Sequence, residues 1–237
     1  GQRNHCCGNQ AHHNHHHAHR IDGTEHFTGQ GWGYYGCTAP LWNFGKRNKF
    51  IALDAAFGIG PADLSDTRIF FADFVEQHLK LSGHGTFLSG GYFKLPMHIS
   101  QLISHEDILS QKIFDINWLS SKGLKRSIKN LKLTARGWSA SLLNALSPAK
   151  LTWNGHNASC HKEFILAVNG FDERMQYGGE DCEFGDRLKH LGLKARRVRY
   201  SAICVHLDHG RGYVTASMLE ANREIRAETL RHRTVKA

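Results

Sequence analysis

The sequence predicts an α/β fold, because helix-like and strand-like patterns alternate over the last two thirds of its 237 residues. The clearest alternation lies near the C-terminus, where a helical pattern over 181–191 precedes an apolar strand pattern over 198–205. Hydrophobic residues make up 41% of the chain and charged residues 22%, as in most globular proteins. No run of 18 apolar residues occurs, so we expect no membrane-spanning helix.

Residues 1–70 do not share this order. Eight of the first 26 residues are histidines, and no helix or strand period persists in the segment. We therefore predict an irregular, His- and Gly-rich segment that is either disordered or non-native. One hypothesis is that it is an out-of-frame reading of a native N-terminal half. A His-rich tract can bind metal ions, and here we expect such affinity to lack a fixed site.

The segment from 71 to 113 predicts three elements in order. Apolar residues at helical spacing predict a helix over 71–81. Residues 86–95 predict a strand that two glycines interrupt. Ser104 and Asp107 have the spacing of a capping box, and they predict a short helix that ends at Ile113.

A basic amphipathic helix over 122–136 is the next predicted element. No acidic residue occurs from Ile116 to Lys162, whereas eight lysines and arginines do. Such a helix is suited to contact with a membrane surface or another polyanion, and a solvated helix face is the alternative. We do not expect a nucleic-acid partner, because no aromatic residues interleave with the basic ones and no nucleic-acid motif accompanies them.

The remaining elements are predicted from residue 151 onward. They are a strand or loop over 151–159, a helix over 161–168, a turn at 171–173, the helix over 181–191, the strand over 198–205 and a helix over 216–233. We assign residues 71–215 to one folded domain. Residues 216–237 then form a C-terminal helical tail.

The most informative short motif is Gly178-Gly179-Glu180-Asp181, at the start of a predicted helix. Glycines let a ligand approach the backbone closely, and acidic residues at a helix start are favoured by the helix dipole. One of the two carboxylates could remove a proton from a hydroxyl nucleophile, which is general-base chemistry. Capping of the helix without any catalytic role is the alternative.

Two earlier segments combine small, amide and acidic residues. Gly155 and Asn157 lie in the segment 154–159, and Asp172 lies in the predicted turn at 171–173. Side chains of these types can line a polar pocket. Each segment taken alone is also typical of a turn.

A histidine closes the last predicted strand. His206 is followed by Asp208 and His209, and such a set could bind a divalent metal ion. A structural role for a lone histidine at a strand end is the alternative. His206 follows Asp181 by 25 positions, with one predicted helix and one predicted strand between them. Such a connection can bring both residues to one site.

In their order and spacing, these segments resemble the family 2 glycosyltransferases of the GT-A fold. The resemblance covers about 72–213 and includes the galactosyltransferase-like C-terminal segment of that family. It is strongest over 157–209, in an Asn-x-Ser element, Val-Asn-Gly-Phe-Asp-Glu, Gly-Gly-Glu-Asp, an alternating strand and His-Leu-Asp-His.

The resemblance implies a GT-A-like mixed sheet flanked by helices, here incomplete, and a metal-assisted inverting transfer in a single displacement. The donor would be a nucleotide sugar, most often a uridine diphosphate sugar, bound through Mn²⁺ or Mg²⁺. Asp181 matches the catalytic base, Glu180 its neighbour in the acceptor pocket, and His206 a histidine that contacts the metal or diphosphate. The remaining substrate-binding positions would be Gly155, Asn157, Asp172, Gly178 and Gly179. The acceptor would be a growing cell-surface glycan, either polysaccharide or lipopolysaccharide, in some cases lipid-linked, at the inner face of a bacterial cytoplasmic membrane.

The chain departs from the family in its first half. The N-terminal strand, the uridine-binding acid and the Phe-x-Asp-x-Asp metal motif are missing, and Asp73 is a poor substitute because it lies inside the predicted helix over 71–81. A catalytically inactive fragment that binds a sugar nucleotide or glycan is therefore the second functional hypothesis. A third is a basic module that binds polyanions or metal through the histidines and the segment 122–136.

Overall fold

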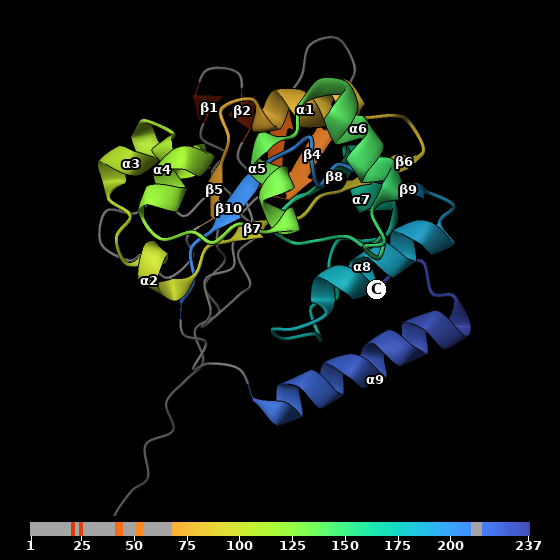
Figure 1. The fold of residues 1–237 in the computed structure, drawn as a ribbon. Coiled ribbons are helices and arrows are strands. Elements are labelled where there is room, and N and C mark those ends of the chain that lie inside the picture. Colours follow the sequence, from red (N-terminus) through yellow and green to blue (C-terminus); the bar gives the residue numbers. More distant parts are fainter. Residues whose placement is uncertain (1–19, 22–23, 26–40, 45–50, 55–67, 210–214) are drawn as a thin grey trace, which may run out of the picture.

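The computed structural model describes residues 20–21, 24–25, 41–44, 51–54, 68–209 and 215–237, and before residue 68 it describes only the backbone (Figure 1). The predictions for the His-rich tract fall outside these residues. Among the described residues, no helix is long and apolar enough to cross a bilayer.

The larger sheet contains five strands in the order β3, β4, β8, β6, β9. Their bounds are Leu41–Phe44, Ile51–Asp54, Ala158–His161, Thr86–Ser89 and Lys194–Arg197. Strand β8 is antiparallel to both β4 and β6, whereas β9 is parallel to β6. The predicted mixed sheet flanked by helices is thus confirmed, and it includes two strands from the segment that we predicted to be irregular.

A second sheet has three strands, and its central strand ends at His206, the predicted site histidine. It consists of β5 (Arg68–Phe70), β10 (Cys204–His206) and β7 (Phe93–Lys94), in that order. Strand β10 is antiparallel to β5 and parallel to β7. Strands β1 (Arg20–Ile21) and β2 (Thr24–Glu25) form a separate antiparallel pair.

The predicted strand over 86–95 is divided between the two sheets, whereas in the one over 198–205 only Cys204 and Val205 belong to a strand. The prediction of a single strand over 198–205 is wrong, since a turn closed by Val198, Ser201 and Ala202 separates β9 from β10. The strand over 86–95 is interrupted at the glycines, as predicted. A Cβ atom on Gly90 would lie 2.0 Å from the Asn157 side chain, so only glycine lets the chain leave the sheet there.

The first helices agree with the local sequence signals. Helix α1 (Phe74–Leu81) begins three residues later than predicted, which places Asp73 at its N-cap and not inside the helix. Helix α2 comprises Met97–Ser100. Both halves of the predicted capping box between Ser104 and Asp107 are present at the start of α3 (His105–Leu109). That helix ends before the 3-10 turn η1 (Lys112–Phe114), so it is shorter than predicted.

The predicted continuous basic helix over 122–136 is wrong. Helix α4 (Ile116–Ser121) ends before Gly123, whose φ of +97° lies in the left-handed region. The chain then forms a 3-10 turn, η2 (Ile128–Asn130), and a short helix, α5 (Leu131–Thr134). Ile128, which would lie on the apolar face of such a helix, opposite the basic residues, is 81% exposed. The basic residues therefore do not lie on one amphipathic helix.

Three later helices are confirmed, namely α7 (Lys162–Ala167), α8 (Glu180–His190) and α9 (Ala216–His232). Helix α6 (Gly137–Leu146) was not predicted. Helix α7 is stopped by Asn169 and Gly170, both with positive φ. In Figure 1, α9 runs beneath α8, on the side of the molecule opposite to α1.

Three apolar clusters hold the two sheets and their helices together. One joins the second sheet to the segment from α2 to α5, and a second joins the five-stranded sheet to α7 and α8 around the fully buried Trp153. The third lies beneath α1 and includes Phe74, Leu88 and Val198. Since Leu88 belongs to one sheet and the neighbouring Cys204 to the other, this cluster fixes the sheets against each other.

Candidate active site at the start of helix α8

The glycine pair before α8 shapes the chain that presents the two acids. Gly178 and Gly179 have φ values of +108° and +95°, a region that favours glycine. A Cβ atom on Gly178 would also lie 2.5 Å from the Leu219 side chain of α9. The motif therefore needs glycine for its backbone conformation, and Glu180 and Asp181 occupy the first turn of the helix.

Asp181 accepts two backbone hydrogen bonds. Its Oδ1 atom accepts from the amide of Cys182 at 2.7 Å, and its Oδ2 atom accepts from the amide of Gly155 at 3.2 Å. The carboxylate also lies at the positive end of the helix dipole. These contacts hold the carboxylate in a fixed position and tie α8 to the loop before β8.

Glu180 occupies a different environment from Asp181. Its Oε2 atom accepts a hydrogen bond from the amide of Gly178 at 2.6 Å. Burial raises the pKa of Glu180, and the neighbouring Asp181 raises it further. The two adjacent acids thus differ in environment, a common feature of paired catalytic carboxylates.

Gly155 connects Asp181 to the second sheet. Its carbonyl oxygen accepts a hydrogen bond from the guanidinium of Arg68 at 3.1 Å, while its amide binds Asp181. Arg68 is the register partner of His206 in the antiparallel pair of β5 and β10. The structure therefore brings the predicted base and the predicted histidine to the same region.

Aromatic rings lead from this region to His206. The ring of Tyr92 packs edge-on against His156, with centroids 4.7 Å apart, and against His206, at 5.2 Å. The His206 ring lies 5.3 Å from that of His209. Sequence reasoning missed Arg68 and Tyr92, which lie in no motif, and passed over His156, although it lies in the segment 154–159 between Gly155 and Asn157.

Asn157 supports the site from inside. The side chain is fully buried, and its Nδ2 atom donates to the carbonyl oxygens of Gly91 and Ala202, at 2.8 and 3.0 Å. Its Oδ1 atom lies 2.9 Å from Nε2 of His78. Every polar atom of this side chain is thus used within the protein, in contrast to the substrate contact that we predicted.

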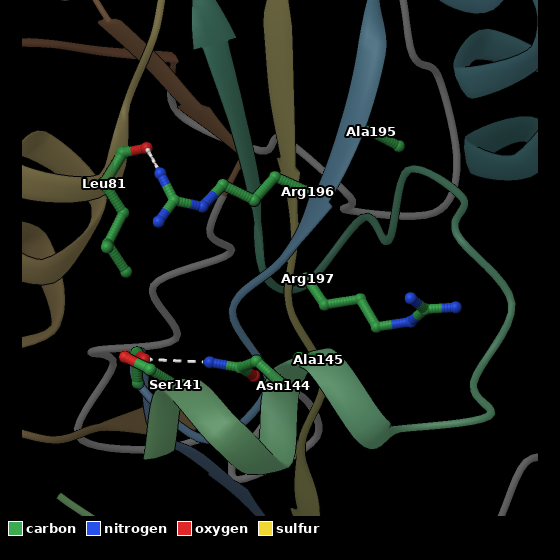
Figure 2. Close-up of a pocket in the computed structure, with 8 residues that line it drawn as sticks. Leu81, Ser141, Asn144, Ala145, Ala195, Arg196 and Arg197 are labelled. Carbon is green, nitrogen blue, oxygen red and sulfur yellow. Dashed lines mark hydrogen bonds between the residues drawn. The ribbon is translucent and has the colours of Figure 1, made fainter. Parts of the chain in front are cut away.

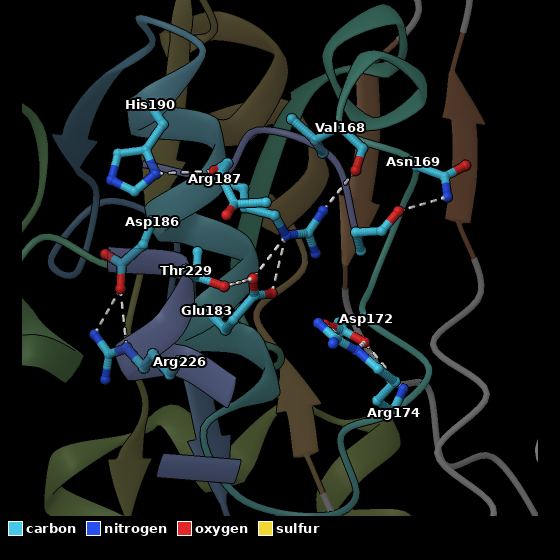
Figure 3. Close-up of polar contacts among 12 residues, drawn as sticks. Val168, Asn169, Asp172, Arg174, Glu183, Asp186, Arg187, His190, Arg226 and Thr229 are labelled. Atoms are coloured by element: carbon cyan, nitrogen blue, oxygen red, sulfur yellow. Dashed lines mark hydrogen bonds and ion pairs between the residues drawn. The ribbon is translucent and has the colours of Figure 1, made fainter. Parts of the chain in front are cut away.

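Asp172 is also engaged within the protein. Its carboxylate forms a bidentate ion pair with Arg174, in which Nε donates to Oδ1 and Nη2 donates to Oδ2 at 2.6 Å. These hydrogen bonds to Arg174 lower the pKa of Asp172. The ion pair is drawn in Figure 3, and it gives Asp172 a structural role in the turn before α8.

The described residues do not form a complete metal site. They contain no group of three or more histidine, cysteine or acidic side chains that could surround a cation. His206 and His209 are close, but the carboxylate of Asp208 forms an ion pair with Lys94 at 2.8 Å. The described chain therefore supplies two imidazoles without the third ligand that a protein metal site usually has.

A cavity of about 340 Å³ lies away from these residues, between α6 and β9 (Figure 2). Arg196 and Arg197 line it, and their guanidinium groups donate to the carbonyl oxygens of Leu81 and Ala149. Asn144 donates to Ser201 on the opposite wall at 2.9 Å. These polar groups are used within the protein, and none of the predicted site residues lines the cavity.

A buried ion pair fixes α8 from its other side (Figure 3). Nε of Arg187 donates to Glu183 at 2.8 Å, and Nη1 donates to the carbonyl oxygen of Val168 at 2.5 Å. Thr229 of α9 donates to the same glutamate at 2.8 Å, and Arg226 pairs with Asp186 at 2.9 Å. The C-terminal helix therefore clamps the helix that carries Asp181.

His78 predicts a specific dependence of stability on pH. Burial lowers its pKa to about 4, and its Nδ1 and Nε2 atoms lie 2.7 and 2.9 Å from Ser159 Oγ and Asn157 Oδ1. The unfolded chain takes up a proton near pH 6.5, whereas the folded chain resists it until about pH 4. The free energy of unfolding should therefore fall as the pH is lowered through this window, by about 1.4 kcal/mol per pH unit for one proton.

Urea unfolding at pH 7 and pH 5 of the wild type and of His78→Gln tests this expectation. The variant should be less stable at pH 7, and its deficit should shrink at pH 5, because it has no imidazole to protonate. His156, whose pKa burial lowers to about 3, acts in the same direction in both proteins and cancels in the comparison. An unchanged deficit would contradict the assignment.

Comparison with known proteins agrees with the position of this site. Residues 149–210 match the family described as the N-terminal domain of galactosyltransferase, and the match spans Gly155, Asp181 and His206. A search of curated proteins gave no significant match. Residues 149–210 are therefore a glycosyltransferase-like segment, set in a mixed α/β structure that is consistent with a glycosyltransferase-like fold.

Proposed function

We propose that the protein transfers a sugar from a nucleotide-sugar donor, with a uridine diphosphate sugar favoured, to a hydroxyl of a growing cell-surface glycan. The observation that carries the proposal is the position of Asp181. It lies on the first turn of α8, bonded to Gly155, inside the segment that matches the galactosyltransferase family. We place the reaction at the inner face of a bacterial cytoplasmic membrane, where lipid-linked acceptors are available.

In this proposal Asp181 acts as general base in a single displacement with inversion. The carboxylate takes the proton of the acceptor hydroxyl as its oxygen forms a bond to the anomeric carbon. The bond from that carbon to the donor diphosphate breaks, and its electron pair leaves with the diphosphate. Hydrogen bonds to the amides of Gly155 and Cys182 orient the carboxylate before the reaction.

The neighbouring groups have supporting roles. Glu180 would face the acceptor, and Gly178 and Gly179 would let it approach the backbone closely. His206 would contact the diphosphate or a divalent cation. Mn²⁺ or Mg²⁺ would neutralise charge on the leaving group, but the described residues contain no group of three or more side chains that could complete its coordination.

The alternative is a catalytically inactive fragment that binds a sugar nucleotide or glycan. It is favoured by the same absence of a complete metal site among the described residues.

Contact of the basic residues in 122–136 with a membrane is also part of the proposal, although it would not use a continuous helix.

A thermal-shift screen of uridine, guanosine and thymidine diphosphate sugars, with and without Mn²⁺, tests donor binding. We expect one nucleotide class to raise the unfolding temperature. A ligand at a concentration of 100 times its dissociation constant stabilises the folded state by about 2.7 kcal/mol. A transfer assay with that donor then separates the two functions. Binding without transfer to any glycan acceptor would favour the inactive fragment. No shift with any donor would contradict the transferase and a fragment that binds sugar nucleotides, and would leave only a fragment that binds glycan.

A further inference from the structure

A group of basic side chains surrounds Tyr92, close to the candidate base. Nζ of Lys132, from α5, donates to the carbonyl oxygen of Tyr92 at 2.9 Å. The guanidinium of Arg199 lies over Gly91, where an added Cβ atom would be 2.7 Å from its Cζ atom. Arg68 approaches from the other side, where it binds the Gly155 carbonyl oxygen at 3.1 Å. Segments that are distant in sequence thus direct three cations to one place.

Two of these three cations are unpaired: across the described part of the chain, neither Lys132 nor Arg199 forms an ion pair, and the Arg199 side chain forms no hydrogen bond. Burial and, to a smaller extent, the positive charges of Arg199 and Lys129 together lower the pKa of Lys132 to about 8. Half-buried like charges cost free energy unless an anion accompanies them.

His156 adds an unused polar atom to this group. Its Nε2 atom is buried, and no described residue forms a hydrogen bond with it. Its ring lies against Tyr92, and the pKa of its imidazole is lowered first by burial and then by Arg68, His206 and Arg199. The surroundings of this imidazole are therefore positive, which suits a ligand that brings negative charge and oxygen atoms.

We propose that Lys132 and Arg199, together with Arg68 and His156, form the binding site for the diphosphate of the sugar donor. The planar guanidinium of Arg199 can hold two phosphate oxygens at once, and Lys132 contributes a compact charge. The site lies beside the base, because Arg68 binds the carbonyl oxygen of Gly155 and Asp181 binds the amide of the same residue. These cations would stabilise the negative charge that the diphosphate gains when its bond to the sugar breaks.

The nature of the ligand rests on the proposed function, but the anion site can be tested without sugar transfer. Isothermal titration with pyrophosphate, in the presence of a chelator, compares the wild type with Arg199→Gln and Lys132→Met. We expect each variant to bind pyrophosphate about tenfold or more weakly, since a charge-assisted hydrogen bond contributes roughly 1.5–3 kcal/mol. Lys80→Gln and Arg231→Gln remove exposed charges elsewhere and should bind like the wild type.

A second measurement guards against loss of structure. Arg199 forms no hydrogen bond to the described residues, so Arg199→Gln should keep or raise the unfolding temperature without ligand. The pKa of Lys132, followed by NMR of its side chain, should rise in this variant. A folded Arg199→Gln that binds pyrophosphate like the wild type would overturn the proposal, as would a wild type that does not bind it.

The outcomes separate this inference from the proposed function. If pyrophosphate binds and the two variants lose it, the anion site stands even when no donor gives transfer. If transfer occurs and Arg199→Gln has an unchanged KM for the donor, the transferase stands and this site is wrong. Inorganic phosphate as a second probe should bind more weakly than pyrophosphate, and equal affinity would argue against a diphosphate site.

Discussion

Replacement of Asp181 by asparagine is expected to lower kcat for sugar transfer by about 10²–10⁴-fold, with little change in donor affinity. The amide oxygen of asparagine can still accept the hydrogen bond from Gly155, so the loop and α8 should stay in place. An amide cannot take the proton of the acceptor hydroxyl, however. The loss should therefore appear in the chemical step, and the donor-induced thermal shift should persist.

Two companion variants make this test specific. Glu180→Gln removes the adjacent acid, which faces the acceptor in our proposal, and should change KM for the acceptor more than kcat. Glu224→Gln removes an exposed charge from α9 and should leave both constants unchanged. Transfer by Asp181→Asn at the wild-type rate would contradict the assignment of the base.

Local signals explain the elements that the sequence predicted. The capping box of Ser104 and Asp107 and the glycine pair before α8 act within a few residues of the chain, so their outcome does not depend on the rest of the fold. The long helix α9 follows from an uninterrupted run of residues that favour helix. The position of Glu180 and Asp181 in the first turn of α8 is likewise set by a local signal, the glycine pair.

The two wrong predictions have different causes, one a tertiary contact and the other a glycine. The apolar run over 198–205 has the composition of one strand, but Val198 and Ala202 are needed in the cluster beneath α1, and the chain turns between them. The basic segment has helical spacing, yet Gly123 ends α4 inside it. The spacing of apolar and basic residues reveals neither the turn between Val198 and Ala202 nor the end of the helix before Gly123.

The cationic site could not be predicted for a related reason. Lys132 and Arg199 are 67 positions apart, and they meet only because both pack against the segment that links β6 to β7. Lys132 lies in the basic segment 122–136, for which the sequence predicted a helix in contact with a membrane surface or another polyanion, and Arg199 lies in no motif. The absence of a neighbouring acid becomes visible only when the folded chain is seen.

Replacement of Arg187 by methionine is expected to destabilise the protein by about 3–5 kcal/mol, because it leaves Glu183 as an uncompensated buried charge. Both side chains are essentially inaccessible to solvent, with exposed fractions of 0% and 1%. Arg187 also supplies the hydrogen bond to the Val168 carbonyl oxygen, which the variant would leave unpaired. Urea unfolding monitored by circular dichroism measures the loss directly.

The exposed pair of Arg223 and Glu220 on α9 provides the matched control. Its ion pair is solvated, with side-chain exposures of 69% and 60%, so Arg223→Met should cost less than about 1 kcal/mol. Changing Glu183 and Arg187 together to leucine and methionine should recover part of the stability that the single change loses, since no buried charge then remains unpaired. If Arg187→Met is no more destabilising than Arg223→Met, the buried pair does not hold α8, and Asp181 must owe its position to Gly155 and the glycine turn alone.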